Sequence, residues 1–359
     1  MTRLFSRTLG ALQPYVPGEQ PAEPISLKLN TNESPFGPSP LALEAIRQAA
    51  NNDLRLYPDY QAQDVRDAIA DYNGISSAQV FIGNSSDEVL AHVYKALFQR
   101  DGVVLTPDIT YSFYVTYGAM FNVKQKQIPL ADDFSIDTAD YVVDHGEPVA
   151  GVIFANPNAP TGRVMGLQEI ADIAQAFPES AVVVDEAYID FGGESAVGLL
   201  GQLDNIVVVQ TLSKSRALAG LRVGYLMASE AVVEALGRVK DSFNPYPLDR
   251  LAMAGAAAAI RDTDYFDQTR QAIMDARQEL SEDLEGLGFS VLPSATNFVF
   301  ARHQQLDAAA IQRALREQGI LVRHFSHPRI EQFLRITVGT SDECRHLWKV
   351  LADILPGLG

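Results

Sequence analysis

Two charged side chains of types that can do chemistry stand where buried strands would end. Lys214 lies in the segment Thr211–Ser215, directly after the apolar run Asn205–Val209. A lysine amine beside hydroxyl groups can act as a nucleophile toward a carbonyl. Asp185 directly follows the run Ala181–Val184, and a carboxylate at such a place is costly to bury unless it has a partner. Taken alone, each motif also fits an ordinary solvated turn.

Two further polar motifs border apolar strands. Gly83–Glu88 opens a helical pattern, and Ser85 with Glu88 three residues later predicts a capping box. A helix start preceded by small residues offers free N–H groups and the positive end of the helix dipole to a phosphate. Asn156–Gly162 follows the run Gly151–Phe154, and its prolines and glycine predict a fixed turn whose polar side chains face a ligand. Capping boxes begin many helices that bind no ligand, so Gly83–Glu88 alone is weak evidence for a phosphate site.

Taken in chain order, the four motifs describe one ligand. Each closes one strand–helix unit, an order that chance would rarely produce. The site asks for a ligand with a phosphate, a basic heteroatom and a carbonyl, and pyridoxal 5'-phosphate has all three. Lys214 would form the internal Schiff base, and Asp185 would keep the pyridine nitrogen protonated. The phosphate would be held by Ser213, Arg222 and the backbone of Ser85, Ser86 and Asp87.

The elements that must position these motifs alternate between buried strands and amphipathic helices. Apolar spacing predicts helices through Val89–Leu97 and Leu167–Phe177. Runs that are apolar at every position are typical of strands buried on both faces, so the alternation predicts an α/β fold. We expect a mostly parallel central sheet with helices on both faces, and ligands beyond the carboxyl ends of its strands. The predicted strands are Val103–Leu105, Gly151–Phe154, Ala181–Val184 and Asn205–Val209.

The pattern changes after the segment Asn244–Pro247. A long Ala-rich helical region follows, and then strands and helices come without strict alternation, which predicts a smaller α+β domain at the C-terminal end. We expect an N-terminal arm over residues 1–35 that packs near the small domain, a large domain over 36–245 and a small domain over 246–359. In the small domain the predicted elements are strands over 290–292, 297–300 and 334–338 and a helix over 308–318.

The start of the chain has a basic, Ser/Thr-containing composition that also occurs in transit peptides. The first fifteen residues contain no apolar segment like the core of a secretory signal peptide. Leu4, Leu9 and Leu12 fall near helical spacing. This spacing favours a short amphipathic arm that packs on the body of the protein.

Overall composition narrows the class of protein. The 359 residues are 47% hydrophobic and 20% charged, which is typical of a globular protein with a large core. The net charge of −17 repels phosphate backbones, so a nucleic-acid binder is not expected, and no apolar run approaches the length of a membrane span. The single cysteine, Cys344, excludes an intramolecular disulfide and favours a reducing, cytoplasmic location.

The sequence resembles the histidinol-phosphate aminotransferases of the fold-type-I pyridoxal-phosphate superfamily. The resemblance covers essentially the whole chain, and its superfamily motifs are highly specific in combination. The matching stretches are Leu29–Pro35, Arg55–Pro58, Gly83–Glu88, Asp185–Tyr188, Thr211–Lys214, Ala219–Arg222 and Leu334–Thr340.

The resemblance implies roles for further residues around the cofactor. Tyr111 would stack on the cofactor ring, and Tyr188 would hydrogen-bond its 3'-oxygen. Tyr57 would reach the cofactor phosphate of a partner subunit, which makes a homodimer the expected catalytic unit. The family often has asparagine directly before Pro160, where this chain has Ala159. Asn158 is the favoured replacement, with Asn156 as the alternative.

The resemblance also implies a substrate site. Arg335 would bind the α-carboxylate that both substrates share, and Arg323 would bind the substrate phosphate with help from Tyr15. Asn32 and Glu33 would lie near the substrate. Without the family match, a surface arginine on a strand would be the better interpretation of both arginines.

The implied reaction is a ping-pong transamination of histidine biosynthesis. Glutamate would donate its amino group and leave as 2-oxoglutarate, and imidazole-acetol phosphate would become L-histidinol phosphate, with Lys214 as general base and acid. An aromatic-amino-acid aminotransferase is the alternative, because it would share every cofactor residue. It differs in that it would have no use for Arg323. A threonine-phosphate decarboxylase would instead release carbon dioxide. We expect no metal. His324 and His327 have a spacing that two metal ligands could use, but Pro328 follows them and no acidic pair is near, which favours a surface loop.

Overall fold

Apolar residues at successive positions of the central strands are buried on alternating faces, which is why these runs form strands. In the computed structural model, which describes residues 4, 9–12, 14–15, 18–21 and 25–358, Val182 and Val184 pack in one hydrophobic cluster and Val183 in another. Successive side chains of a strand point to opposite faces of its sheet, so a strand covered on both sides has no place for a polar residue.

The larger of two sheets has seven strands and carries the predicted motifs. Its neighbouring strands pair in parallel, except that β8 runs antiparallel to both β2 and β7. The prediction of a mostly parallel sheet is therefore confirmed, and each predicted strand falls on an observed one. In spatial order the strands are β2 (Val80–Asn84), β8 (Val223–Met227), β7 (Ile206–Thr211), β6 (Ala181–Asp185), β5 (Val149–Ala155), β3 (Val103–Pro107) and β4 (Gln125–Ile128).

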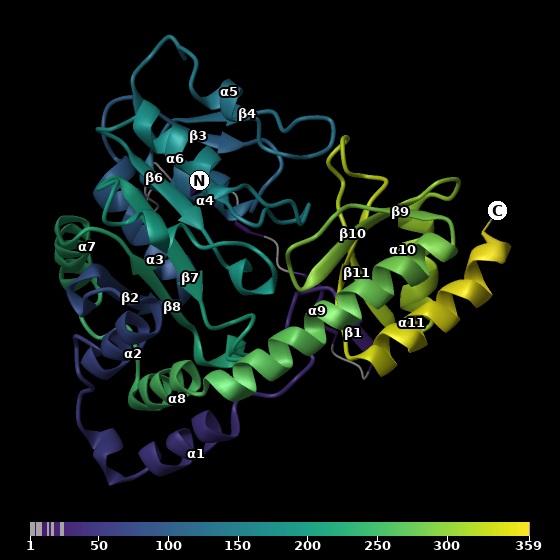
Figure 1. The fold of residues 1–359 in the computed structure, drawn as a ribbon, viewed down its shortest axis with the longest axis horizontal. Helices are drawn as coiled ribbons and strands as arrows, with labels where there is room; N and C mark the ends of the chain where they lie inside the picture. The colour runs from purple at the N-terminus through teal and green to yellow at the C-terminus, as the bar shows by residue number, and fades with distance from the viewer. Residues whose placement is uncertain (1–3, 5–8, 13, 16–17, 22–24, 359) are drawn as a thin grey trace.

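Helices cover both faces of this sheet (Figure 1). One face packs against α2 (Gln63–Asn73), α6 (Leu167–Ala176) and α8 (Arg250–Arg261), and α1 (Pro40–Ala49) packs on α8. The other face packs against α3 (Ser85–Val93), α4 (Phe113–Phe121) and α7 (Glu230–Phe243). The short helix α5 (Thr138–Tyr141) lies beside α6. The predicted helices through 89–97 and 167–177 are thus present.

The smaller sheet has five strands with helices on one face. The helices α9 (Thr263–Gly286), α10 (Ala308–Glu317) and α11 (Ser341–Ile354) share one hydrophobic cluster with it. The order is β1 (Leu27–Leu29), β11 (Ile320–His324), β12 (Leu334–Thr337), β10 (Phe298–His303) and β9 (Phe289–Val291). Its opposite face meets the larger part of the chain through a cluster that includes Phe134, Phe300 and Phe333.

Short helices occur in the connections of both parts. They are η1 (Leu9–Ala11), η2 (Asn52–Arg55), η3 (Ser77–Gln79), η4 (Tyr94–Phe98), η5 (Ile189–Phe191), η6 (Ala196–Leu199), η7 (Ala219–Leu221) and η8 (Leu355–Gly357). All are of the 3-10 type except η4, which is a π-helix directly after α3.

The packing changes later in the chain than the predicted limit between residues 245 and 246. Leu248, Ala252 and Ala256 belong to the hydrophobic cluster of the larger sheet, so α8 packs with that sheet. The next helix, α9, runs from the end of α8 to the smaller sheet (Figure 1). The physical reason is that α8 buries its Ala-rich face against α1 and α2.

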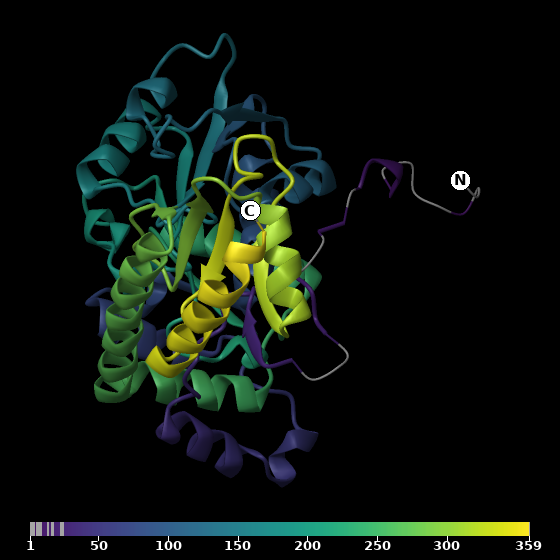
Figure 2. The same cartoon turned by 90° about the vertical axis from the view of Figure 1, so that its right-hand side faces the viewer.

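The described residues near the N-terminal end divide into two kinds. Leu27–Leu29 pairs in parallel with β11 and forms an edge strand of the smaller sheet. Leu4 is 91% exposed and Leu9 is also exposed, and Figure 2 shows η1 away from the rest of the chain. The expected packing of an amphipathic arm on the body is therefore not found for these two leucines.

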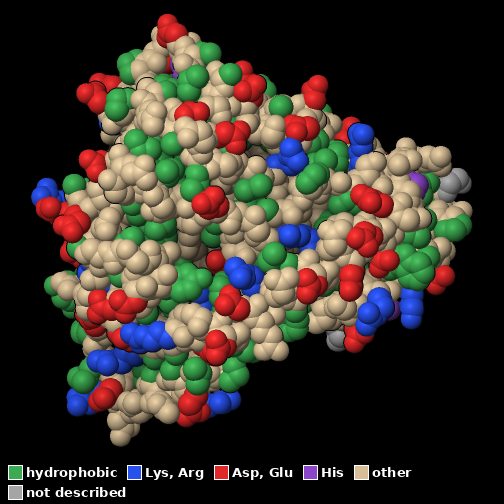
Figure 3. Space-filling model, in the orientation of Figure 1, with side chains coloured by type: hydrophobic (Ala, Val, Ile, Leu, Met, Phe, Trp, Pro, Cys, Tyr) green, Lys and Arg blue, Asp and Glu red, His purple; other side chains and the backbone are tan. Residues whose placement is uncertain are grey.

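Charged side chains are distributed over the surface. On the face drawn in Figure 3, acidic and basic side chains are interspersed, with no single basic patch. Among the helices that the structure describes, none combines the length and the apolar character that a membrane crossing requires.

Candidate active site

The carboxyl ends of the parallel strands open into a cavity of about 260 Å³. Residues from both sheets line it, because Ala155, Asp185 and Thr211 end strands of the larger sheet while Arg323 and Arg335 lie on the smaller one. The cavity brings together most of the residues predicted from the sequence. They are Tyr15, Asn32, Ser85, Ser86, Asp87, Tyr111, Asp185, Tyr188, Ser213, Lys214, Arg222, Arg323 and Arg335.

One end of the cavity is built from the start of α3 and the turn before β8. The Ser85 amide donates a hydrogen bond to the Arg222 carbonyl over 2.7 Å, and both residues adopt positive φ values of 67° and 55°. Gly224 permits this contact, since a Cβ there would lie 2.1 Å from the Ser86 nitrogen. The close approach leaves the N-terminal end of a nine-residue helix facing the cavity, which favours an anion.

The predicted capping box at this helix is wrong in its register. The helix begins at Ser85 itself, so Asn84 is the N-cap residue and makes no side-chain cap bond. Glu88 accepts a hydrogen bond from the Asn84 amide over 2.5 Å, and Ser85 Oγ accepts one from the Asp87 amide over 3.2 Å. The left-handed backbone of Ser85 shifts the first turn by one residue relative to the sequence pattern.

Asp87 connects the predicted phosphate-binding residues to each other. Its Oδ2 lies 2.7 Å from Arg222 Nη2, and its Oδ1 accepts a hydrogen bond from the Tyr111 hydroxyl over 3.1 Å. Ser85 Oγ also donates to Oδ2 over 3.0 Å. Burial, and the carboxylate of Asp87, raise the pKa of Tyr111, so this phenol stays protonated as a donor.

Asp185 is a buried carboxylate at the end of β6. Oδ2 accepts a hydrogen bond from the Tyr114 hydroxyl over 2.8 Å, and Oδ1 accepts one from the Ala187 amide over 3.2 Å. Burial raises the pKa of Asp185 to about 6, although these hydrogen bonds act against the shift. Among the described residues no cationic side chain forms an ion pair with it, so the carboxylate is matched to a cation supplied by a ligand.

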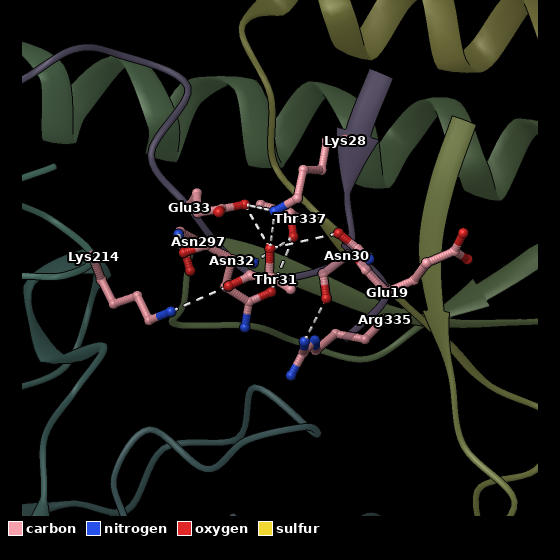
Figure 4. A network of polar contacts seen from close by, with 10 residues as sticks. All are labelled: Glu19, Lys28, Asn30, Thr31, Asn32, Glu33, Lys214, Asn297, Arg335 and Thr337. Atoms are coloured by element: carbon pink, nitrogen blue, oxygen red, sulfur yellow. Dashed lines mark hydrogen bonds and ion pairs between the residues drawn. The ribbon is translucent and has the colours of Figure 1, made fainter. Parts of the chain in front are cut away.

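Lys214 extends into the same cavity from the loop after β7. Its Nζ donates a hydrogen bond to the Thr31 carbonyl over 3.2 Å (Figure 4) and lies 5.8 Å from the centre of the Tyr188 ring. No carboxylate of the described residues forms an ion pair with Lys214. A lysine held only by one carbonyl is free to move and to react with a carbonyl compound.

Arg323 and Arg335 form a pair of like charges on neighbouring strands. The two are direct cross-strand partners in β11 and β12, an arrangement that is destabilising unless an anion lies between or beside them. Arg335 donates from Nη2 to the Asn30 carbonyl over 2.9 Å, while its buried Nε has no partner. Burial, and the charge of Arg323, lower the pKa of Arg335. Within the described part of the chain neither arginine has a carboxylate partner.

Three predicted residues do not line the cavity of their own chain. Asn158 is buried, and its amide donates to the Ile109 carbonyl and to Thr161 Oγ1, inside the turn. Glu33 accepts hydrogen bonds from Lys28 and from Thr31 Oγ1. Tyr57 is 79% exposed and stacks on Tyr246. Asn156, the alternative to Asn158, is likewise used within the turn, by the backbone of Met165.

Some aromatic residues at or near the cavity were not singled out by the sequence analysis. Phe325 lines the cavity, and the guanidinium carbon of Arg323 lies 5.6 Å from its ring centre. Tyr15 packs against Phe113 with ring centroids 4.9 Å apart. Tyr114 was also missed. Its position one helical turn after Tyr111 was the signal that could have found it.

The comparisons with known proteins place the chain in a class. The family described as aminotransferase class I and II matches residues 24–351, and the chain belongs to this family. A curated protein of Bordetella parapertussis, histidinol-phosphate aminotransferase 1, is 56% identical over 354 residues, covering 99% of each chain. The histidinol-phosphate aminotransferase of Pseudomonas syringae is 52% identical over 99% of this chain and 100% of its own.

The solved structures agree with this placement. A crystal structure of histidinol-phosphate aminotransferase from Sinorhizobium meliloti in complex with pyridoxal-5'-phosphate has a TM-score of 0.90. It is 27% identical and covers 100% of this chain and 99% of its own. Within its class the chain therefore belongs with the histidinol-phosphate aminotransferases, and its fold is that of the fold-type-I enzymes.

The residues present fit the cofactor that the sequence predicts. The helix start, Ser213 and Arg222 can hold a phosphate, and the buried carboxylate of Asp185 can hold a protonated ring nitrogen. Gly224 supports the assignment, because any larger residue would fill the space that the start of α3 occupies. Lys214 lines the same cavity, where its amine could attack an aldehyde.

The raised pKa of Asp185 predicts a pH-dependent stability of the cofactor-free protein. The folded state binds this proton more tightly than the unfolded state, whose aspartate pKa is about 3.9, so the contribution is present below pH 4 and lost as pH rises through about 6. Asp185→Asn should therefore become more stable relative to the native chain between pH 5 and pH 7.5. The full effect of a shift of about two units is about 3 kcal/mol.

Denaturant unfolding of both cofactor-free proteins at several pH values measures this difference. Asp204→Asn, at an exposed turn, is the matched control and should show no such trend. Glu186 is also buried with a pKa raised to about 7, but it is present in both proteins and so cancels. A difference between Asp185→Asn and the native chain that does not vary with pH would contradict the burial argument.

Proposed function

We propose that this chain transfers the amino group of L-glutamate to imidazole-acetol phosphate, with pyridoxal 5'-phosphate as cofactor. The products are 2-oxoglutarate and L-histidinol phosphate, and the reaction belongs to histidine biosynthesis. The arginine pair carries the proposal. L-glutamate has an α-carboxylate for Arg335 and a side-chain carboxylate that can use Arg323. L-histidinol phosphate and its keto counterpart have a phosphate and no carboxylate, so the expectation of an α-carboxylate shared by both substrates is wrong, and the phosphate is the anion that they offer to the two arginines.

The cofactor, when bound, supplies an aldehyde that condenses with amines and a ring that withdraws electrons from the carbon bearing the amine. The chain supplies the rest. Asp185 holds the ring nitrogen in its protonated state, since a nearby anion favours the charged form. Tyr111 would lie against the ring, and the start of α3 with Ser213 and Arg222 would hold the phosphate.

Lys214 moves the proton. With its amine free, Nζ would be the base that removes the proton from the carbon bearing the substrate amine, and the acid that returns it to the carbon on the other side of the amine nitrogen. The Thr31 carbonyl holds the amine in the cavity from the side of the smaller sheet. Arg335 would fix the α-carboxylate of glutamate, or the phosphate of the second substrate, so that the carbon bearing the amine stays within reach of Nζ.

Removing Arg323 separates this proposal from an aromatic-amino-acid aminotransferase. Arg323→Ala should lower kcat/KM for L-histidinol phosphate by about 2–4 kcal/mol, or roughly 30- to 700-fold, because a charge pair with the phosphate is lost. L-phenylalanine, which has no phosphate, should be affected far less. Steady-state transamination with both donors and 2-oxoglutarate measures the two ratios.

The matched control for this test is Arg302→Ala. Arg302 is an exposed arginine on β10 of the same sheet and does not line the cavity, so neither substrate should respond to its loss. An equal loss on both substrates in Arg323→Ala would remove Arg323 from the phosphate-binding role.

We also propose that the active unit is a homodimer to which each partner contributes Tyr57. The exposed Tyr57 stacks on Tyr246 within a surface that carries further exposed apolar side chains, an arrangement typical of an interface. The exposed apolar side chains near Tyr57 or Tyr246 in the sequence are Leu54, Leu56, Tyr60 and Phe243. Tyr57 would donate to the cofactor phosphate of the partner subunit. The single and buried Cys344 supports a cytoplasmic location for this dimer.

Mixed dimers test the shared site. Lys214→Ala and Tyr57→Phe should each reduce transamination, the first by several orders of magnitude because nucleophile and base are lost together. Co-refolded or co-expressed mixtures should regain activity, since one site of each mixed dimer combines an intact Lys214 with an intact Tyr57. A mixture no more active than the sum of its parts would contradict the sharing of Tyr57.

A further inference from the structure

A chain of hydrogen bonds runs from the smaller sheet to the Tyr188 hydroxyl. The backbone N–H of Asn32 donates to Thr337 Oγ1 over 3.0 Å, and Thr337 Oγ1 donates to the side-chain oxygen Oδ1 of Asn32 over 3.0 Å. Asn32 Nδ2 then donates to the Tyr188 hydroxyl oxygen over 2.9 Å. Figure 4 shows Asn32 beside Thr337, next to Thr31, whose carbonyl accepts the hydrogen bond from Lys214.

The hydrogen bonds of this chain run in one consistent direction. A backbone N–H can only donate, so Thr337 Oγ1 accepts from it and has one proton left to give. Asn32 Oδ1 is the acceptor of that proton, which leaves Nδ2 to face Tyr188. An amide NH₂ can only donate, so the Tyr188 oxygen accepts. The phenolic proton of Tyr188 must therefore point elsewhere.

The conformation of Asn32 is held in place from a second direction. The Asn297 amide donates to the Asn32 carbonyl over 3.0 Å, and Asn32 is buried with a φ of 58°. Asparagine tolerates this left-handed backbone better than most residues. The neighbouring carbonyls of Asn30 and Thr31 accept hydrogen bonds from Arg335 and Lys214, so the segment touches three of the groups assigned to the reaction.

The cavity wall opposite this chain lacks an amide. Ala159, which directly precedes Pro160, lines the cavity with a methyl group, and Asn158 is turned into the loop. In place of such an amide, Tyr188 has a hydroxyl proton that it can donate into the cavity.

We propose that Thr337 and Asn32 are positioning residues that direct the Tyr188 proton to the 3'-oxygen of the bound cofactor. The inference rests on the cofactor proposed above and gives Asn32 a role through Tyr188 in place of a contact with substrate. A proton donated to the 3'-oxygen stabilises negative charge there, so it favours release of the proton that the bound cofactor shares with Lys214 Nζ. Losing the chain should make that proton harder to remove.

The experiment is a pH titration of the visible absorbance of the cofactor-loaded protein without any amino acid present. Thr337→Val, which keeps the size of the side chain and removes its hydroxyl, should raise the absorbance-detected pKa by roughly half to one unit, as expected for one neutral hydrogen bond. Thr337→Ser should restore a value near that of the native chain. The charged groups around the site remain in every variant: Lys214, Asp185, Asp87, Glu33, Arg323 and Arg335.

Two further variants separate a directed proton from simple loss of packing. Asn32→Gly removes the amide while glycine keeps the left-handed backbone, and it should raise the same pKa. Thr106→Val alters a buried threonine on β3 whose hydroxyl has no partner, and it should leave the pKa unchanged. In a Tyr188→Phe background, which itself raises the pKa, adding Thr337→Val should produce no additional rise.

The possible results of these titrations distinguish a failure of the inference from a failure of the proposed function. An unchanged pKa in both Thr337→Val and Asn32→Gly with cofactor bound would overturn the inference, and so would an equal rise in the Tyr188→Phe background. Loss of substrate turnover alone would leave the absorbance titration intact and would concern the proposed reaction only. A native chain that binds no cofactor would overturn both the inference and the proposed function.

Discussion

The burial of the Asp185 carboxylate is the constraint on which the site depends. A carboxylate in an apolar interior is costly unless it is hydrogen-bonded and meets a positive charge. Tyr114 and one backbone amide satisfy part of this requirement, and no cation of the described residues satisfies the rest. The parallel sheet places this group where strands β5, β6 and β7 end together, so the missing positive charge is provided by whatever fills the cavity.

The other side of the cavity carries positive charges that likewise have no ion-pair partner among the described residues. Arg323 and Arg335 face each other across β11 and β12, and both sheets must be held in their mutual arrangement for the cavity to exist. The cluster around Phe300 and Phe333 joins the two parts of the chain beside it. A protonated ring nitrogen of the cofactor would match Asp185, and anionic groups of the substrate would match the two arginines. One cavity with these two sides can therefore hold cofactor and substrate together.

Much of this was predictable from the sequence, for a physical reason. Strands buried on both faces, such as Ala181–Asp185, are apolar at every position, and polar residues at their ends mark the ligand side of a parallel sheet. Asp185, Lys214 and Arg222 could therefore be found without a structure. The prediction failed where local backbone geometry decides, as at Ser85, whose positive φ moved the helix start.

The remaining features depend on contacts between distant parts of the chain. The partnership of Asn32 with Thr337 joins residues 305 positions apart, and no local pattern announces it. Tyr114 looks like any buried helix residue until its hydroxyl is found on Asp185. The predicted boundary near residue 246 rests on a change of composition, whereas the packing of α8 on α1 and α2 keeps residues up to Ile260 with the larger sheet.

The central claim is that the cavity is built for an amine that carries a phosphate. Its most direct test is a titration of the cofactor absorbance of the loaded native protein with L-histidinol phosphate and, separately, with L-phenylalanine. The account predicts conversion to the aminated cofactor at far lower concentrations of L-histidinol phosphate. An equal or stronger response to L-phenylalanine would contradict it and identify a general aromatic aminotransferase instead.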